Sequence, residues 1–539
     1  MSHTEARTLR PAPSFARTAI TAISILLLLV VLGIVLFTML RSPLKDDIAW
    51  LLYVARRWLA GRELYVDVVE VNPPLIVWIS AIPIQLASIL GIDAQFTAIP
   101  LFVAGVLGCA WWTASLLQGT GRLFDDRLPV FAAIGTVLLV VPAGDLGQRE
   151  HLLVAALLPY LALFARSLHG DRPPLRDALI AGALAGLGCA LKPRYAGIFV
   201  VLEGLALLHG RNPFNAKALA AGVTMLAYAA LVAVFCPAYL RRAVPLALAL
   251  YGATDVPLRH LVIDSLRLMF GQAVALVLWW TRRRSVPEGS LMLTLVVFAV
   301  AATAICFMDG KDWFYHRLPA TVATVLALLC WAASAMMQHR SNRRATLPVI
   351  AGAVAVVVFL VAAFQRLEPQ VALAVQPEQG TVAKLERLIR KQQARTYIAF
   401  SEWIALGFPV VNNTGVTWAS RFDSMWALKG ELWRARFDAA GAKEWPIRRW
   451  VAHDFIIGCP DIAVVDTREG VVNYVGVLSA SDPAFARAWS RYRQIAAFDG
   501  LVIYRRAATG CADPWVAAEA LQAAAVQATA VQATTATGH

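Results

Sequence analysis

The residues best suited to chemistry lie in four short segments at the edges of long apolar runs. The first segment, Arg41–Asn72, holds the adjacent carboxylates Asp46 and Asp47. A carboxylate at a lipid–water boundary can act as a general base toward a hydroxyl group. Either carboxylate could instead cap the amphipathic helix expected over Ile48–Ala60, which should lie flat on the membrane. The spacing alone leaves both roles open.

The second segment is 144–151, Gly-Asp-Leu-Gly-Gln-Arg-Glu-His, which opens an apolar run. Ionisable residues beside a membrane helix are costly and usually functional. Glu150 or Asp145 could supply a further catalytic carboxylate, Arg149 could hold a phosphate through its planar fork, and His151 could share a proton. The alternative is that this segment only caps the helix and anchors it at the interface.

The third segment is Lys192-Pro193-Arg194, between two short apolar runs. Two cations at a helix break suit an anionic phosphate or pyrophosphate group. Lys192 and Arg194 could equally extend toward lipid headgroups, and a cytoplasmic position would weaken the phosphate interpretation.

The fourth segment, 309–317, combines carboxylates, cations and aromatic rings. Lys311, His316 and Arg317 could bind a phosphate, and the rings between them could stack on a sugar. A membrane aromatic belt would explain the rings but not their charged neighbours.

The elements that position these segments are membrane helices. Of the 539 residues, 59% are hydrophobic and 16% are charged, and the mean hydropathy is +0.61. Soluble domains are usually about 45–50% apolar and about 25% charged, and a span needs about 20 apolar residues. Twelve apolar runs are expected, at residues 18–40, 73–90, 94–118, 128–143, 151–168, 178–191, 196–209, 217–236, 262–280, 291–308, 318–337 and 347–364.

The net charge of +14 comes from basic residues in short loops between these runs. This pattern indicates cytoplasmic loops rather than nucleic-acid binding, and it fits membrane lipids as partners. The N-terminus is expected in the cytoplasm and the C-terminal part outside. Twelve crossings would return the chain to the cytoplasm, so one run must differ. The run 73–90, with Pro73, Pro74 and Pro83, is the best candidate, which leaves eleven or thirteen crossings.

Hydrophobicity stops near Ala363. The chain therefore divides into a cytoplasmic arm (1–17), a multi-helix membrane domain (18–364), a soluble α/β domain (365–516) and a low-complexity tail (517–539). Short strands are expected at 396–400, 462–465 and 501–504, and helices at 383–393 and 481–493. Cys459 and Cys511 could pair if this domain lies outside the cytoplasm.

The order of motifs in the first loop resembles the GT-C superfamily of membrane glycosyltransferases. An acidic pair is followed by Leu59-Ala60-Gly61, then Leu64-Tyr65-Val66-Asp67, then Asn72-Pro73-Pro74-Leu75. The pattern is most similar to the bacterial branch with the lipid A aminoarabinose transferases and the protein O-mannosyltransferase-like enzymes. The resemblance is good over residues 18–120 and looser to about 365.

This resemblance implies an all-α polytopic membrane domain of about 11–13 transmembrane helices. It implies transfer of a sugar from a polyprenyl-phosphate donor to a glycan, lipid or protein acceptor, at the outer face of the bacterial cytoplasmic membrane. Family members usually carry Asp-Glu in the first loop, with the Asp essential. Asp46 matches that Asp and Asp47 matches the Glu, so the Asp-Asp pair leaves open which one acts.

Under this hypothesis Asp46 is the base, Asp47 assists it, and Glu150 and Arg149 complete the junction between donor and acceptor. The cations at 192, 194, 311, 316 and 317 neutralise the leaving phosphate. A divalent metal is compatible with the carboxylates, although no ligand set demands one. No nucleotide cofactor is expected, because the chain has no Gly-x-Gly-x-x-Gly or Walker loop.

Two other hypotheses stay open. A transporter or flippase for a lipid-linked or anionic solute could use the same charges to bind and move its substrate. A non-catalytic assembly or sensor protein would depend on the outer domain and not on the charge at Asp46. The glycosyltransferase hypothesis requires the loops 41–72, 144–151 and 309–317 to converge.

Overall fold

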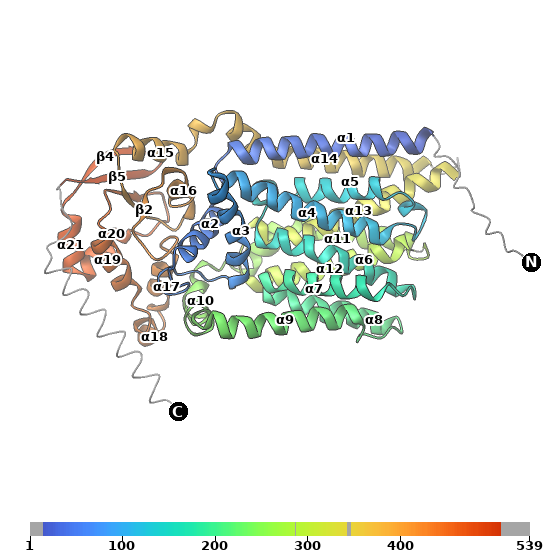
Figure 1. Ribbon diagram of the computed structural model, residues 1–539, viewed down its shortest axis with the longest axis horizontal. Coiled ribbons are helices and arrows are strands. Elements are labelled where there is room, and N and C mark those ends of the chain that lie inside the picture. The colour runs from blue at the N-terminus through green and yellow to red at the C-terminus, as the bar shows by residue number, and fades with distance from the viewer. Residues whose placement is uncertain (1–14, 286, 342–345, 508–539) are drawn as a thin grey trace, which may run out of the picture.

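The computed structural model describes residues 15–285, 287–341 and 346–507. A long helical bundle carries a smaller sheet domain on one end, which we call the domain end (Figure 1). Residues 1–14 of the expected arm, the tail 517–539 and Cys511 lie outside the described residues. The pairing of Cys459 with Cys511 therefore stays a prediction.

Each of the twelve apolar runs coincides with a helix in the part of the chain that the structure describes. Helices suit these runs because hydrocarbon offers the backbone no hydrogen-bond partners, so each segment must satisfy its own. Eight of the described helices are long and apolar enough to span a membrane: α1, α4, α6, α9 and α11–α14. The twelve helices are α1 (Phe15–Arg41), α3 (Pro74–Leu90), α4 (Gln95–Leu117), α5 (Arg127–Val140), α6 (Arg149–Leu168), α7 (Leu175–Leu191), α8 (Gly197–Leu208), α9 (Ala216–Phe235), α11 (Leu258–Arg282), α12 (Glu288–Asp309), α13 (Phe314–Ser341) and α14 (Thr346–Val375).

Helix α3 begins and ends at the domain end of the bundle. The chain enters it from the loop that contacts the sheet domain. After α3 the chain passes the end of α1, where Gln95 Nε2 donates to Met39 O at 2.6 Å and to Ser42 O at 2.9 Å. The run 73–90 therefore does not cross the bundle, as its prolines suggested. The chain then passes back and forth along the bundle and leaves α14 at the domain end, where it enters the sheet domain (Figure 1).

Helix α2 (Asp46–Leu59) lies between the bundle and the sheet domain. Ile48–Ala55 are all buried. The Phe408 ring of the sheet domain is 4.8 Å from the Trp50 ring and 4.9 Å from the Tyr53 ring, centroid to centroid. The expectation that this helix lies flat on lipid is wrong, because Ile48–Ala55 are all buried within the protein and leave no apolar face for the membrane.

The sheet domain is α/β, as expected. Its five strands follow the order β2-β1-β3-β5-β4, with the first three parallel and the last two antiparallel to their neighbours. The helix expected over 481–493 is shorter than predicted, because strand β4 begins at Tyr492. The strands are β1 (Thr396–Phe400), β2 (Thr417–Trp418), β3 (Ile462–Asp466), β4 (Tyr492–Phe498) and β5 (Leu501–Arg506). The helices are α15 (Thr381–Lys391), α16 (Val410–Thr414), α17 (Trp426–Arg434), α18 (Ala439–Lys443), α19 (Ile447–Gly458), α20 (Tyr474–Ser481) and α21 (Pro483–Trp489).

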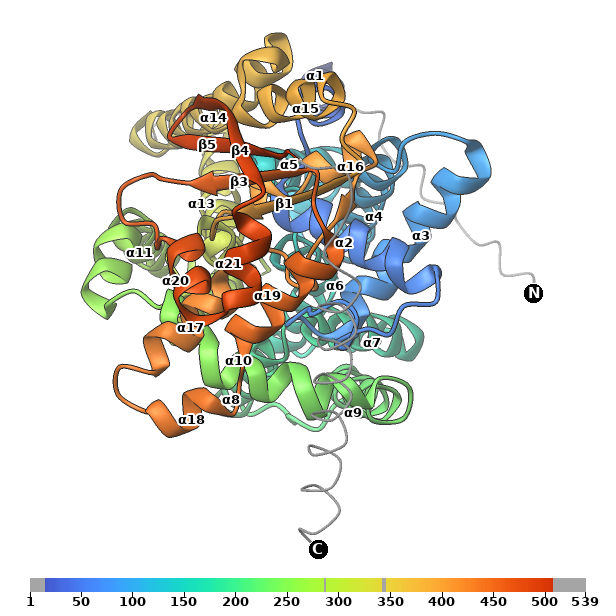
Figure 2. The ribbon, with the colours of Figure 1, turned by 90° about the vertical axis from the view of Figure 1, so that its left-hand side faces the viewer.

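The loops that follow β1 and β2 face the bundle. The loop after β1 places Phe408 against α2. In the loop after β2, the backbone carbonyl of Arg421 accepts a hydrogen bond from the Val69 amide at 2.8 Å. Figure 2 looks onto the sheet domain along the bundle and shows it over the bundle end. Ligands of open α/β sheets bind at the carboxyl ends of parallel strands. Here that edge is directed at the membrane helices.

Candidate functional site

The three charged loops converge at the domain end of the bundle. Gln148 Nε2 donates to Asp47 Oδ2 at 3.0 Å, which joins the first loop to the second. Lys192 Nζ lies 2.6 Å from Glu150 Oε1 and 3.1 Å from Asp309 Oδ2, which joins the second loop to the fourth segment. Lys192 therefore lies at the same end as the other segments. We call Asp47, Arg149, Glu150, Lys192, Asp309 and His316 the polar cluster.

The two adjacent carboxylates of the first loop have different environments. Asp46 Oδ1 accepts the Asp47 amide at 2.9 Å and lies 3.3 Å from Lys45 Nζ, so its contacts are local. Asp47 is turned toward α6. Burial and the charge of Asp46 raise the pKa of Asp47 to about 6, against the lowering effects of Arg149 and Lys45. Asp47 is therefore better placed than Asp46 to act as a base.

Arg149 is a buried cation at the start of α6, with 5% of its surface exposed. Among the described residues its guanidinium makes no ion pair within 4.0 Å, and its Nε has no hydrogen-bond partner. Its charge nevertheless lowers the pKa values of both Asp47 and Glu70, so it lies among their carboxylates. A buried charge is costly unless it is paired, and a guanidinium pairs best with a carboxylate or phosphate. Arg149 is thus suited to an anionic ligand.

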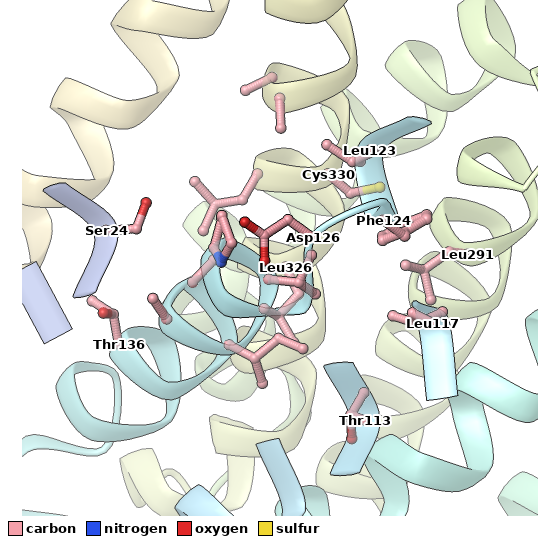
Figure 3. Close-up of a pocket in the computed structure, with 18 of the residues that line it drawn as sticks. Ser24, Thr113, Leu117, Leu123, Phe124, Asp126, Thr136, Leu291, Leu326 and Cys330 are labelled. Atoms are coloured by element: carbon pink, nitrogen blue, oxygen red, sulfur yellow. The ribbon is translucent and has the colours of Figure 1, made fainter. Parts of the chain in front are cut away.

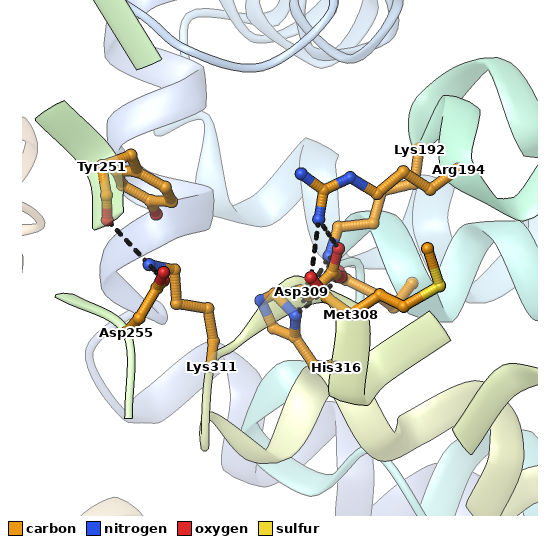
Figure 4. Close-up of polar contacts among 9 residues, drawn as sticks. Lys192, Arg194, Tyr251, Asp255, Met308, Asp309, Lys311 and His316 are labelled. Carbon is orange, nitrogen blue, oxygen red and sulfur yellow. Dashed lines mark hydrogen bonds and ion pairs between the residues drawn. The ribbon is translucent and has the colours of Figure 1, made fainter. Parts of the chain in front are cut away.

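Lys192 is the centre of a charge network that Figure 4 shows. Its Nζ contacts Glu150, Asp309 and, at 3.3 Å, His316 Nδ1. Arg194 Nη1 lies 2.5 Å from the second oxygen of Asp309. Two carboxylates thus hold two cations in place, and the fully buried Glu150 acts on Lys192 rather than facing Asp47.

Lys311 is fully occupied by contacts with its neighbours, and Arg317 only partly. Lys311 Nζ donates to Tyr251 O at 2.8 Å and to Thr254 Oγ1 at 2.5 Å, and it pairs with Asp255 (Figure 4). Burial lowers the pKa of Lys311 in spite of Asp255. These contacts use all three ammonium donors, so Lys311 holds the turn η5 (Tyr251–Thr254). Arg317 Nη2 donates to Asp312 O at 2.7 Å. The geometry favours a structural role for Lys311. The Arg317 Nε is buried without a hydrogen-bond partner among the described residues, so the phosphate-binding role of Arg317 stays a prediction.

His151 lies inside the bundle rather than among the site groups. The Gly147 amide donates to its Nδ1 at 3.1 Å, and its Nε2 contacts the Leu138 carbonyl at 2.8 Å. Both ring nitrogens are therefore occupied by backbone groups. This arrangement joins α5 to the turn before α6, and it does not support a proton-sharing role.

Sequence reasoning did not find Asp423, which the sheet domain brings to the polar cluster. Asp423 lies in the loop after β2, and its Oδ1 accepts a hydrogen bond from the adjacent Ser424 hydroxyl at 3.3 Å. Burial and the charges of Glu70 and Asp47 raise its pKa to about 8. The nearby Tyr251 also has a raised pKa, through burial and then the charge of Asp47. No local motif marks Asp423; its position at the carboxyl end of a parallel strand is the only available signal.

Glu70 fixes the shape of the first loop. Its oxygens accept from Trp50 Nε1 at 2.5 Å and from the Val71 and Asn72 amides, each at 2.7 Å. Burial raises its pKa although these bonds and Arg149 oppose the effect. Glu70 therefore acts as an anchor that also adds negative charge beside Asp423.

No cluster of three or more His, Cys, Asp or Glu residues that could hold a metal ion occurs among the described residues. The acidic residues of the site are instead distributed between different partners. A divalent metal stays a prediction without a ligand set.

Comparison with known proteins gives a structural likeness only. No protein-family model and no curated protein matches the sequence. The crystal structure of ArnT from Cupriavidus metallidurans bound to undecaprenyl phosphate is similar, with a TM-score of 0.53 and 13% identity, over 92% of this chain and 99% of that one. The archaeal oligosaccharyltransferase AglB from Archaeoglobus fulgidus, in complex with an inhibitory peptide and a dolichol-phosphate, gives 0.46 and 11% over 90% and 74%. The likeness to ArnT shows that this chain has the GT-C type of fold expected from its sequence.

Proposed function

We propose that this protein is a glycosyltransferase that transfers a sugar from a polyprenyl-phosphate donor to an acceptor hydroxyl. The shared fold supports the proposal, because the ArnT structure holds undecaprenyl phosphate. The fold alone does not specify chemistry, since one fold can host several functions. The polar cluster supplies the chemical argument.

The proposal rests mainly on one arrangement: a carboxylate, Asp47, and a buried cation, Arg149, lie beside each other at the start of α6. Arg149 is buried without an ion pair among the described residues, and Asp47 is held beside it by Gln148. A lipid phosphate would supply the anion that Arg149 lacks, through a bidentate contact. Asp47 would then lie close to the sugar–phosphate bond. A cation for the leaving group and a carboxylate for the acceptor are what this transfer requires.

The reaction follows from these two groups. Asp47 removes the proton of the acceptor hydroxyl, and the resulting oxygen nucleophile attacks the anomeric carbon of the sugar. The bond between that carbon and the phosphate oxygen breaks, and its electron pair stays on the phosphate. The polyprenyl phosphate leaves with one more negative charge, which Arg149 stabilises. Asp47 later releases its proton to water.

Lys192 is the second cation for this phosphate. Glu150 and Asp309 hold its ammonium group in place, so its position is fixed before the donor binds. Such fixed charges stabilise a transition state without reorganisation during the reaction. Asp309 and His316 are positioning residues in this scheme, and Arg194 reinforces Asp309 from a more exposed position.

The sheet domain forms the acceptor side of the site. Asp423 faces the carboxylates of the bundle, and the Trp426 ring lies 5.2 Å from the Tyr251 ring. With its pKa near 8, Asp423 is protonated at neutral pH and can donate a hydrogen bond to an acceptor oxygen. The acceptor would therefore bind between the bundle and the carboxyl edge of the sheet.

The membrane orientation of the site follows from the loop charges. Arg282 ends α11, and Arg283 and Arg284 follow it, at the end of the bundle opposite the sheet domain. Basic loops of membrane proteins lie in the cytoplasm. The polar cluster and the sheet domain then lie on the extracytoplasmic face of the bacterial cytoplasmic membrane, where polyprenyl-phosphate sugars are used by the family that the sequence resembles.

The test uses the full chain in lipid vesicles with a polyprenyl-phosphate donor labelled in its sugar, and an envelope extract as the source of acceptor. The proposal predicts release of free polyprenyl phosphate and labelled product, both lost in Asp47→Asn. Movement of intact donor between leaflets, with its sugar–phosphate bond retained, would instead support the transporter hypothesis and reject this one.

A further inference from the structure

An apolar cavity of about 590 Å³ lies between α1, α5, α13 and α14 (Figure 3). Its lining includes Arg122–Asp126, the loop between α4 and α5 at the bundle end opposite the sheet domain, so it lies far from the polar cluster. Its volume is in the range of ligand sites, about 300–1,000 Å³. Leu27 of α1, Leu326 of α13 and Leu360 of α14 are among its lining residues. The glycosyl-transfer scheme does not use this cavity.

The walls of the cavity place it in the hydrocarbon region. Helices α1, α4, α6, α12, α13 and α14 all contribute lining residues, and each is a candidate membrane span. A cavity walled by such helices and lined mainly by carbon atoms is a poor site for water, which needs several polar partners. Its occupant should therefore be a hydrocarbon chain.

The charged residues of the cavity lining, Arg122, Asp125 and Asp126, gather at one end. Thr21 Oγ1 donates to Asp126 Oδ2 at 2.9 Å, where α5 begins, and Arg122 lies in the adjacent turn. The Arg127 guanidinium lies 4.4 Å from the Trp111 ring centroid, a contact typical of the membrane interface. A molecule with its headgroup at this level and its chain directed toward the bilayer centre would match the lining.

The two helices that close one side of the cavity are, together with α9, the least buried candidate spans of the described bundle. Only 11% of the α14 window and 17% of the α1 window are buried, and the two helices contact each other. A chain could enter from the membrane beside them with little loss of protein packing. Helix α1 leads to the loop with Asp46 and Asp47, and α14 leads to the sheet domain. An occupant that packs against both helices would therefore help to fix the positions of that loop and of the sheet domain.

We propose that this cavity binds one acyl chain of a phospholipid from the leaflet opposite the sheet domain. Asp125 and Asp126 also lie at that end of the cavity, but the neighbouring loops and helix ends carry Arg166, Arg172, Arg176 and Arg282–Arg284, an excess of basic residues that suits an anionic headgroup such as phosphatidylglycerol. The proposal does not depend on the glycosyltransferase reaction, because binding can be measured without turnover.

The test fills the cavity with a larger side chain. Ala133→Phe and Ala333→Phe place a ring in it, and Ala230→Phe adds the same ring on the exposed face of α9 as a matched control. Each full-length protein is washed in detergent, and the retained lipid is identified by mass spectrometry. The wild type and Ala230→Phe should retain phosphatidylglycerol and show a higher Tm when it is added back. Both filled variants should lose the retained lipid and the shift in Tm.

A second measurement uses only the wild type, so it does not depend on the folding of a variant. Phosphatidylglycerol with a photoreactive group in its acyl chain should label cavity residues of α1, α5 or α13. Labels confined to exposed faces such as α9 would overturn the proposal. Equal lipid retention by the filled variants, or polyprenyl phosphate as the retained molecule, would also overturn it.

Discussion

Gln148 and Asp47, which are 101 residues apart, are joined by a hydrogen bond of 3.0 Å from Nε2 to Oδ2. Gln148 immediately precedes Arg149, so one short backbone segment orients the carboxylate and supplies the adjacent cation. Gln148 is fully buried and Arg149 nearly so, and protein atoms therefore surround this segment. The distance between the proposed base, Asp47, and the proposed phosphate-binding residue, Arg149, is therefore set where the first loop contacts the start of α6.

The first prediction separates the two adjacent aspartates. Asp47→Asn should lower kcat by about 100- to 10,000-fold, the usual contribution of a general base. Asp46→Asn should have a much smaller effect, because the polar contacts of Asp46 within the described part of the chain are local, with Lys45 and the Asp47 amide. Initial rates of polyprenyl phosphate release would measure both. An Asp46→Asn variant as inactive as Asp47→Asn would reject this assignment.

The second prediction concerns Arg149. Arg149→Lys keeps the charge but loses the planar fork, so the KM for the donor should rise by a factor that corresponds to about 1.5–3 kcal/mol. Arg149→Gln should also lower kcat. Arg194→Gln is the matched control, because Arg194 is 58% exposed and pairs with Asp309. Binding of polyprenyl phosphate to each variant gives an independent measurement. Equal loss in the Arg194 control would contradict the role of Arg149.

The third prediction is a bell-shaped pH profile of kcat/KM. Asp47 must be ionised to act as a base, and its pKa is about 6, so the rate should fall as the pH drops below 6. Asp423 must be protonated to donate, and its pKa is about 8, so the rate should fall as the pH rises above 8. Initial rates between pH 5 and pH 9.5, spanning both values, would define the two limbs.

Asp423→Asn provides the control for the alkaline limb. An amide donates a hydrogen bond at every pH in this range, so the alkaline limb should flatten while the acidic limb stays. An unchanged alkaline limb in this variant would assign that limb to another group, such as Lys311, whose pKa burial lowers.

Much of the architecture was predictable from the sequence, because it depends on local pattern. Apolar runs determine the membrane helices, and basic loops predict which ends of the helices lie together. The prolines at 73 and 74 correctly marked the run that does not cross. The convergence of Gln148 with Asp47 and of Lys192 with Glu150 follows once the helices alternate in direction.

The details of the site were not predictable, because they depend on side-chain direction and on long-range docking. Asp46 and Asp47 are adjacent on one helix, and only the position of Gln148 shows which faces α6. His151 and Lys311 have suitable chemistry, yet the folded chain occupies them with backbone and loop partners. Asp423 reaches the site only because the sheet domain docks on the bundle.

The last prediction tests this docking through Gly430 of α17. A Cβ atom added there would lie 2.6 Å from the Leu250 carbonyl oxygen of α10 (Val244–Leu250), closer than such atoms approach each other. Backbone atoms cannot yield as a flexible side chain can, so Gly430→Ala should push α17 away from the bundle. Overpacking of this kind typically costs about 1–3 kcal/mol. The loop that carries Asp423 ends where α17 begins, so it should move with the helix.

Two measurements together distinguish docking from general instability. Gly430→Ala should increase proteolysis of the sheet domain and raise the KM for the acceptor, while binding of polyprenyl phosphate to Arg149 in the bundle stays close to the wild type. Gly204→Ala in α8 is the control, because no atom lies within 4 Å of its added Cβ. If Gly430→Ala left the acceptor KM unchanged despite a displaced sheet domain, that domain would not form the acceptor side of the site.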